Sequence, residues 1–140
     1  MHKQLKYLFI LGYIFFSPGA LAHALIINPH TPTAELSRNS IRAIFAMRTP
    51  QWSDGTPVHV FVLADNHPLH TSFCKESLGM FPYQLRRIWD RQVFSGTGIA
   101  PTTVKSIAEM RERVASTTGA IGYIQPDQVN ASVIQISEGF

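Results

Sequence analysis

The sequence predicts an α/β domain with a small mixed sheet flanked by helices. The first observation is a set of short apolar runs, rich in β-branched residues and of the length that strands have. The second is that stretches with apolar residues at three- and four-residue steps lie between those runs, so helices and strands are interleaved. The predicted order is β-α-β-α-α-α-β-β, with strands at residues 24–28, 58–63, 120–124 and 132–136.

The chain begins with the pattern of a secretory signal peptide, which we place at residues 1–22. A short basic region precedes an uncharged, mostly apolar run at residues 7–16, and that run is shorter than the roughly twenty residues that cross a bilayer. A small-residue pattern predicts cleavage after Ala22, which makes His23 the first residue of a periplasmic chain without a membrane span. Residues 23–140 then form a single domain, since 118 residues (140 minus 22) is a typical domain length.

The charge balance of that domain argues against a nucleic-acid partner. The full chain has 12 Lys and Arg against 9 Asp and Glu, and removing Lys3 and Lys6 leaves 10 against 9. Nucleic-acid-binding domains carry a clustered basic stripe. Arg86, Arg87 and Arg91 cluster only on one short predicted helix, which we interpret as a solvated face.

The first half of the domain is expected to alternate strand, helix and strand. The helix that begins near Leu36 has Ser37 as its predicted N-cap. Asp54-Gly55 marks a turn, and Trp52 beside it is expected to pack onto the core. The run at residues 58–63 is nearly continuous in apolar character, as in a strand that is covered on both faces.

Three helices and two strands are expected in the second half. One helix begins at Pro68 and ends at Gly79, and the next has Pro82 near its first position. Ser106 and Glu109 form a capping box at the start of the third helix. The chain then returns in the last two strands.

Two loops are candidates for a ligand site. Ligands of open α/β sheets bind beyond the carboxyl ends of the strands. The loop after the strand at residues 58–63 is in that place, and the glycine-rich loop after the helix at Pro82 is its expected neighbour. The candidate ligand-binding residues are Asp65, Asn66, His67, His70, Thr71, Ser72, Ser95, Gly96 and Thr97.

Metal binding is an alternative for the first loop. His67 and His70 are three residues apart, which places them on one side of a helix. Pro68 lies between them, so the two histidines are expected to straddle the helix start. A structural zinc site takes four ligands, usually including cysteine. We therefore assign no metal and no cofactor, and keep His67 and His70 as the candidates should a metal bind.

Catalysis is not expected. A nucleophile can be combined with His70 and Asp65, but no nucleophile-elbow or protease motif surrounds these residues. The single cysteine, Cys74, rules out an internal disulfide and lies on the apolar side of its helix. We expect a buried thiol that acts as a small hydrophobic side chain. The sequence therefore predicts a binding protein and not an enzyme.

Several segments together resemble a known family. The segment LSRNSIRAIFAMRTPQWSDG, a strand, a polar loop leading to Phe73 and the segment TTGAIGYI occur in the order of the second lobe of phosphate-type periplasmic substrate-binding proteins of ABC transporters. The resemblance spans residues 36–124 and implies a single lobe of a type II periplasmic-binding-protein-like fold. The matching positions are Leu36, Ser37, Ile44, Phe45, Trp52, Gly55, Gly119, Ala120, Ile121, Gly122 and Tyr123.

The resemblance also implies a function for the first loop. Members of this family clamp an oxyanion between two lobes, and the second lobe supplies an Arg and a Gly-Ser-Gly-Thr segment at a helix N-terminus. The Arg position falls at Asp65 here, and the other four fall at residues 68–71, where only Thr71 matches. An acid in place of the cation and the loss of both glycines predict that phosphate is not held tightly.

We therefore expect an exported accessory or sensing module, or a weak ligand-binding module, with a degenerate anion loop. Its partner is a small anion or an envelope protein, either a transporter or a membrane sensor. Two alternatives stay open at this point. One is a genuine phosphate or oxyanion binding protein, and the other is a periplasmic protein that binds metal through histidine.

Overall fold

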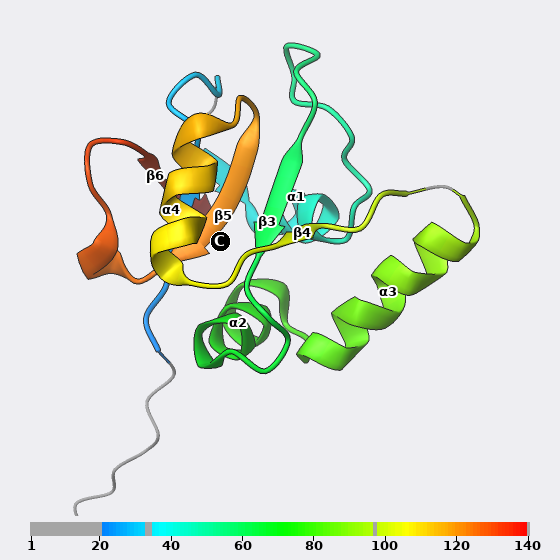
Figure 1. The fold of residues 1–140 in the computed structure, drawn as a ribbon. Coiled ribbons are helices and arrows are strands. Elements are labelled where there is room, and N and C mark those ends of the chain that lie inside the picture. Colours follow the sequence, from blue (N-terminus) through cyan, green and yellow to red (C-terminus); the bar gives the residue numbers. More distant parts are fainter. Residues whose placement is uncertain (1–20, 33–34, 97, 140) are drawn as a thin grey trace, which may run out of the picture.

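The computed structural model of the chain describes residues 21–32, 35–96 and 98–139. The predicted signal peptide, apart from its last two residues, lies outside these ranges. Six strands form one sheet in the order β2-β6-β1-β5-β3-β4 (Figure 1). The strands are β1 (Ala24–Ile27), β2 (Glu35–Ser37), β3 (His59–Val62), β4 (Thr102–Thr103), β5 (Ala120–Ile124) and β6 (Ile134–Gly139).

The sheet is mixed, as the sequence predicts. β1 runs antiparallel to both of its neighbours, β5 and β6. β3 runs parallel to β4 and β5, and β2 runs parallel to β6. Every residue of β1 and of β5 is buried, because both strands are covered on their two faces.

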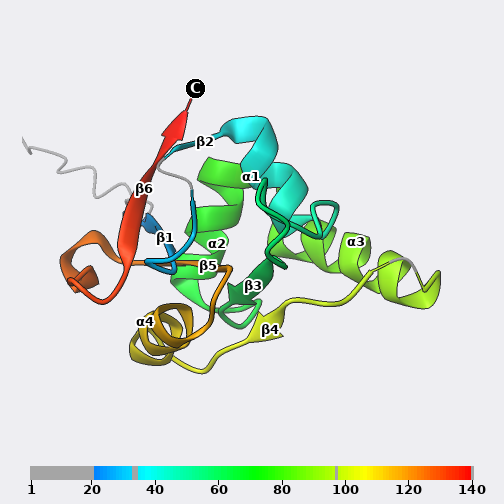
Figure 2. The same ribbon diagram turned by 90° about the horizontal axis from the view of Figure 1, so that it is seen from above.

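Helices lie on both sides of this sheet. α4 (Ile107–Ser116) covers one face, and α1 (Arg38–Phe45) and α2 (Pro68–Phe73) cover the other (Figure 2). A π-helical turn, η1 (Cys74–Leu78), continues α2, and a 3-10 turn, η2 (Pro126–Gln128), precedes β6. α3 (Pro82–Phe94) projects away from the sheet in both views (Figures 1 and 2).

The predicted helix boundaries are confirmed by their caps. Ser37 Oγ accepts from the N–H of Ser40 at 3.1 Å, and Ser106 Oγ accepts from that of Glu109 at 3.1 Å. Gly79 follows η1 with φ 65°, a left-handed conformation that glycine adopts without strain. The side chains of Ser37 and Ser106 satisfy backbone groups that a helix end leaves without partners.

Two glycines in the TTGAIGYI segment are required by packing. A Cβ at Gly122 would lie 2.5 Å from Met110 Sδ, so the absence of a side chain lets α4 approach β5 closely. Gly119 has φ 78°, and a Cβ there would meet the carbonyl oxygen of Pro57 at 2.1 Å. The family-like glycines of this segment therefore have structural roles.

The core between the layers confirms two further expectations. Trp52 is buried, and its Nε1 donates to the carbonyl of Gly119 at 2.9 Å. Cys74 is buried and free. β2 and β4 were not predicted, because three and two residues are too few to show a periodicity. Across the ranges that the structure describes, none of the helices combines the length and apolar character that a membrane crossing requires.

Candidate functional site

The loop between β3 and α2, together with α2 itself, holds most of the predicted site residues, and several of their polar atoms bond to the protein itself. His67 is the N-cap of α2, where its Nδ1 accepts from the N–H of Leu69 at 3.1 Å. The N–H of His67 donates to Ala64 O at 2.9 Å, and that of Thr71 donates to His67 O at 3.1 Å. Pro68 has no N–H to offer. The start of α2 therefore uses several backbone donors internally.

Two hydroxyl groups of α2 also have partners. Thr71 Oγ1 donates to His67 O at 3.4 Å. Ser72 Oγ donates at 2.6 Å to the carbonyl oxygen of Leu21, a residue of the predicted signal peptide. Ser72 is buried, whereas Asn66 is exposed. An anion at this loop would have to displace bonds that the protein already makes, which costs free energy.

Asp65 occupies the position where the sequence comparison placed an arginine. Its two carboxylate oxygens accept from Arg86 Nε and Nη2 at 3.0 and 2.9 Å, a bidentate ion pair. The Arg86 hydrogen bond lowers the pKa of Asp65, so the carboxylate stays ionised. Arg86 also stacks over the ring of Trp89, 5.0 Å from its centroid. The pair leaves no net positive charge to attract an anion.

His70 belongs to a buried network that runs from β3 to α3. The Tyr123 hydroxyl accepts from the N–H of Leu63 at 2.9 Å and bonds to His70 Nδ1. Because that hydroxyl has one proton to donate, His70 carries its own proton on Nε2, which faces Cys74 Sγ at 3.5 Å and Asp65 Oδ1 at 4.0 Å. The network uses both ring nitrogens of His70.

Burial decides the protonation states in this network. It lowers the pKa of His70 to about 4 and raises the pKa of Cys74 to about 12. The imidazole is therefore neutral and the thiol is protonated at neutral pH. Cys74 is not a thiolate, so it is neither a nucleophile nor a metal ligand in this state.

The expected neighbour of this loop lies elsewhere. Ser95 and Gly96 follow the last residue of α3, at the end that projects furthest from the sheet (Figure 1). Arg86, which contacts Asp65, is nine residues earlier, about 14 Å along the helix. The structure does not bring Ser95 and Gly96 next to Asp65, because α3 carries them away from it. Thr97 lies outside the described residues.

No metal centre is built from the two histidines of the loop. His67 Nδ1 is occupied by the cap, and His70 is enclosed in the core. Within residues 21–32, 35–96 and 98–139, no group of three or more His, Cys, Asp or Glu residues is arranged to hold a metal ion. The prediction that the two histidines straddle the helix start is confirmed.

A second polar cluster, which the sequence analysis missed, joins the chain's N-terminal segment to β6. His23 Nε2 lies 2.9 Å from Glu138 Oε1 and 2.6 Å from Ser77 Oγ, and Ser77 donates to both oxygens of Glu138 at 2.7 and 2.9 Å. On the other side of the ring, His23 Nδ1 lies 3.6 Å from Glu76 Oε2. The residues are up to 115 positions apart, so no sequence pattern indicates them.

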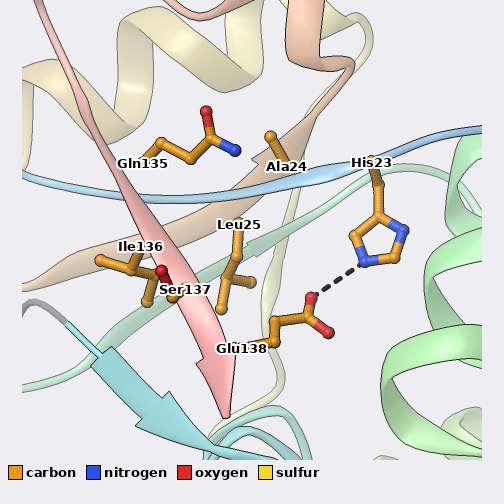
Figure 3. Close-up of a pocket in the computed structure, with 7 residues that line it drawn as sticks. All are labelled: His23, Ala24, Leu25, Gln135, Ile136, Ser137 and Glu138. Carbon is orange, nitrogen blue, oxygen red and sulfur yellow. Dashed lines mark hydrogen bonds and ion pairs between the residues drawn. The ribbon is translucent and has the colours of Figure 1, made fainter.

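This cluster borders a surface depression of about 500 Å³ between β1 and β6 (Figure 3). The hydrogen bond from His23 lowers the pKa of Glu138. An ionised Glu138 accepts hydrogen bonds only, so it takes the Ser77 proton and the proton on His23 Nε2. The imidazole is thereby held in one orientation and one tautomer.

The far end of α3 is the most exposed apolar part of the described chain. Phe94 and Ile99 are 93% and 82% exposed, and Val93 beside them is also exposed. We call Val93, Phe94 and Ile99 the arm tip. Arg87 and Arg91 are exposed on the same helix, and Asp90 is its exposed acid.

Comparison with solved structures identifies the fold. The chain superposes on an ABC-type phosphate transport receptor from Vibrio cholerae with a TM-score of 0.66 and 19% identity, over 84% of this chain and 46% of that one. A protein described as a phosphate ABC transporter substrate-binding protein from Clostridium perfringens, solved with bound phosphate, gives 0.68 and 18%, over 84% and 44%. PstS from Borrelia burgdorferi gives 0.63 and 15%, over 84% and 47%.

These structures confirm the predicted resemblance at the level of the fold. The chain spans less than half the length of each of the three proteins, as expected of a single lobe. The first two are described as phosphate transport proteins. No family model and no curated protein matches the sequence.

Proposed function

We propose that this chain is an exported single-lobe protein that docks a partner of the envelope, and that it does not clamp phosphate. The partner is a transporter component or a membrane sensor, so the chain acts as an accessory or sensing module without catalytic activity. Export rests on the signal-peptide pattern at residues 1–22. The observation that carries the proposal is that the anion loop is bonded to other residues of the processed domain while the arm tip is exposed.

The internal bonding of the loop supports a degenerate anion site. An anion cradle offers free N–H groups, hydroxyls and a cation to the solvent. Here Thr71 donates to a backbone carbonyl, His67 caps its own helix, and Arg86 is paired with Asp65. Binding phosphate would break these contacts and place it beside a carboxylate.

The exposed arm tip supports the proposal that a protein docks there. Val93 and Phe94 at the C-terminal end of α3, and Ile99 in the segment that follows, present exposed apolar side chains. α3 itself projects from the sheet (Figure 2). Exposed apolar groups of this kind mark interaction surfaces when they gather in one place. Arg87 and Arg91 outnumber Asp90 on the exposed side of α3, which favours a partner with an apolar contact surface and acidic residues around it.

Calorimetry on the purified domain tests whether the chain binds phosphate. We expect no saturable heat up to about 1 mM phosphate, the concentration equivalent to roughly −4 kcal/mol of binding free energy. Thr71→Ala is the matched control, because Thr71 is the one position that fits the family's segment. Micromolar binding that Thr71→Ala weakens would establish the alternative of a genuine oxyanion-binding protein.

The docking proposal is tested by site-specific photo-crosslinking in the native envelope. A photoreactive residue at Phe94 is expected to capture one membrane or transporter protein, whereas one at the exposed Glu112 of α4 is expected to capture none. The captured protein is then purified, and the double substitution Phe94→Ser and Ile99→Ser should weaken its binding at least about tenfold. Unchanged affinity, or crosslinks only to a second copy of this chain, would overturn the proposal.

A further inference from the structure

The polar cluster around His23 has a feature that the proposed function does not use. The His23 side chain is only 8% exposed, and its ring meets Phe73 edge-on with centroids 5.3 Å apart. Its Nδ1 is buried and makes no hydrogen bond to any residue that the structure describes. A buried ring nitrogen without a hydrogen-bond partner is uncommon in folded proteins and calls for an explanation.

The partners of Nε2 determine which ring nitrogen carries the proton when the imidazole of His23 is neutral. Glu138 accepts the proton of Nε2 at 2.9 Å, and Ser77 lies 2.6 Å from the same atom. In the neutral imidazole the proton is then on Nε2, and the lone pair is on Nδ1. Figure 3 shows Nδ1 pointing away from Glu138. In metal-ligating histidines, a carboxylate commonly accepts the proton of one ring nitrogen while the other nitrogen binds the metal.

The predicted processing supplies a second nitrogen at the same residue. Cleavage after Ala22 converts the backbone N of His23 into a free α-amino group. The α-amine and Nδ1 of one histidine close a six-membered ring on a metal ion, and Glu76 Oε2, 3.6 Å from Nδ1, is an oxygen donor beside them. Two nitrogens and a carboxylate oxygen are the donor set that Cu(II) prefers in tetragonal geometry.

We propose that the processed N-terminus is a Cu(II) site formed by the α-amine and Nδ1 of His23 with Glu76, and oriented by Glu138 and Ser77. The site uses one histidine and one carboxylate of the folded domain, which is why it is not a cluster of three metal-ligating side chains. It is independent of α3 and of the loop at Asp65. The inference rests on cleavage after Ala22, which is the first thing to test.

Intact-mass spectrometry of the protein recovered from the envelope tests the cleavage. The expected mass is that of residues 23–140, and any other N-terminus overturns the proposal. The chain that begins at His23 is then compared with a control in which the α-amine of the same chain is acetylated. This control retains the fold, the imidazole and both carboxylates, and it loses only the free amine at position 23.

Copper binding is measured by titration with Cu(II) alone and by electron paramagnetic resonance. The chain that begins at His23 is expected to bind one Cu(II) with two nitrogen donors. The acetylated control should bind more than about 100-fold more weakly, because the amine no longer closes a chelate with the imidazole. Glu138→Gln should weaken binding about 10- to 100-fold while the coordinating atoms stay the same.

Further controls distinguish copper binding at the proposed site from copper binding elsewhere on the surface and from a folding defect. Circular dichroism and the urea midpoint of each variant confirm that the fold is retained before binding is compared. Equal affinity of the two N-termini, or a signal that survives His23→Gln, would show that copper binds elsewhere and would overturn the proposal. Loss of copper binding would leave the docking function untouched, because Phe94 is not part of the site.

Discussion

His70 and His23 are both buried histidines next to carboxylates, and the difference between them lies in one nitrogen atom. His70 has Tyr123 at Nδ1 and faces Cys74 and Asp65 with Nε2, so both ring nitrogens have partners. His23 has Glu138 and Ser77 at Nε2, and no hydrogen bond at Nδ1 among the described residues. His70 is thus a structural residue, whereas His23 has a ring nitrogen without a hydrogen bond.

The comparison also bears on the two histidines that the sequence singled out, His67 and His70. His67 and His70 are close in sequence, and proximity suggested a shared ligand. In the fold each of them satisfies a separate structural need, a helix cap and a core network. Binding capacity depends on polar atoms that the folded chain leaves without partners, and sequence spacing does not report these.

The largest expected effect is the loss of the His70 network. His70→Ala should lower the free energy of unfolding by about 3 kcal/mol, because it leaves a cavity and removes the acceptor of the Tyr123 hydroxyl. His67→Ala, which removes only a partly exposed cap, should cost about 1 kcal/mol or less. Urea unfolding followed by tryptophan fluorescence measures both. Equal effects would contradict the distinction between cap and core.

The pH dependence of stability tests the same residue in another way. The pKa of His70 is about 4 in the folded chain, below its ordinary value of 6.5. Between these values the unfolded chain binds a proton that the folded chain does not, so stability falls as the pH falls. The slope approaches about 1.4 kcal/mol per pH unit at most.

Between pH 6.5 and 4.5, the contribution of His70 to the pH dependence of stability can be distinguished from those of Asp65 and Glu138. Asp65 and Glu138, whose pKa values are lowered, lose their stabilising contributions only as the pH falls below their ordinary values of 3.8 and 4.5. Urea midpoints of the wild type and of His70→Phe should therefore diverge in this window. Parallel curves would show that His70 is protonated alike in the folded and unfolded chains.

A smaller effect is expected in the His23 cluster. Ser77→Ala removes a buried donor to Glu138 and should lower the free energy of unfolding by about 1–2 kcal/mol. The exposed Ser116→Ala is the matched control and should stay within about 0.5 kcal/mol of the wild type. Thermal unfolding without added metal measures the difference. A neutral Ser77→Ala would mean that Glu138 orients His23 without its help.

The smallest effect is expected at the Asp65–Arg86 pair. Both side chains are about 40% exposed, so solvent and salt screen their attraction. Asp65→Asn should cost less than about 1 kcal/mol at low ionic strength, and less again in 1 M salt. Urea midpoints at the two salt concentrations test this. A large cost that salt does not reduce would place the pair in the core network with His70.

The elements of this fold were predictable because their causes are local. Ser37, Gly79 and Ser106 mark helix ends through hydrogen bonds or backbone angles that depend on a few neighbouring residues. Apolar periodicity identified the long elements for the same reason. β2 and β4 escaped prediction, since edge strands of two or three residues exist only through their pairing with β6 and β3.

The sequence by itself determined the α/β class, the helix and strand pattern and the departure from the family's anion segment at Asp65. Only the tertiary structure decided that α3 carries Ser95 away from Asp65 and that Arg86 neutralises this carboxylate. Only the tertiary structure brought His23, Ser77 and Glu138 together from three segments. The physical reason is that propensity and capping act over a few residues, whereas a site depends on contacts that chain folding alone creates.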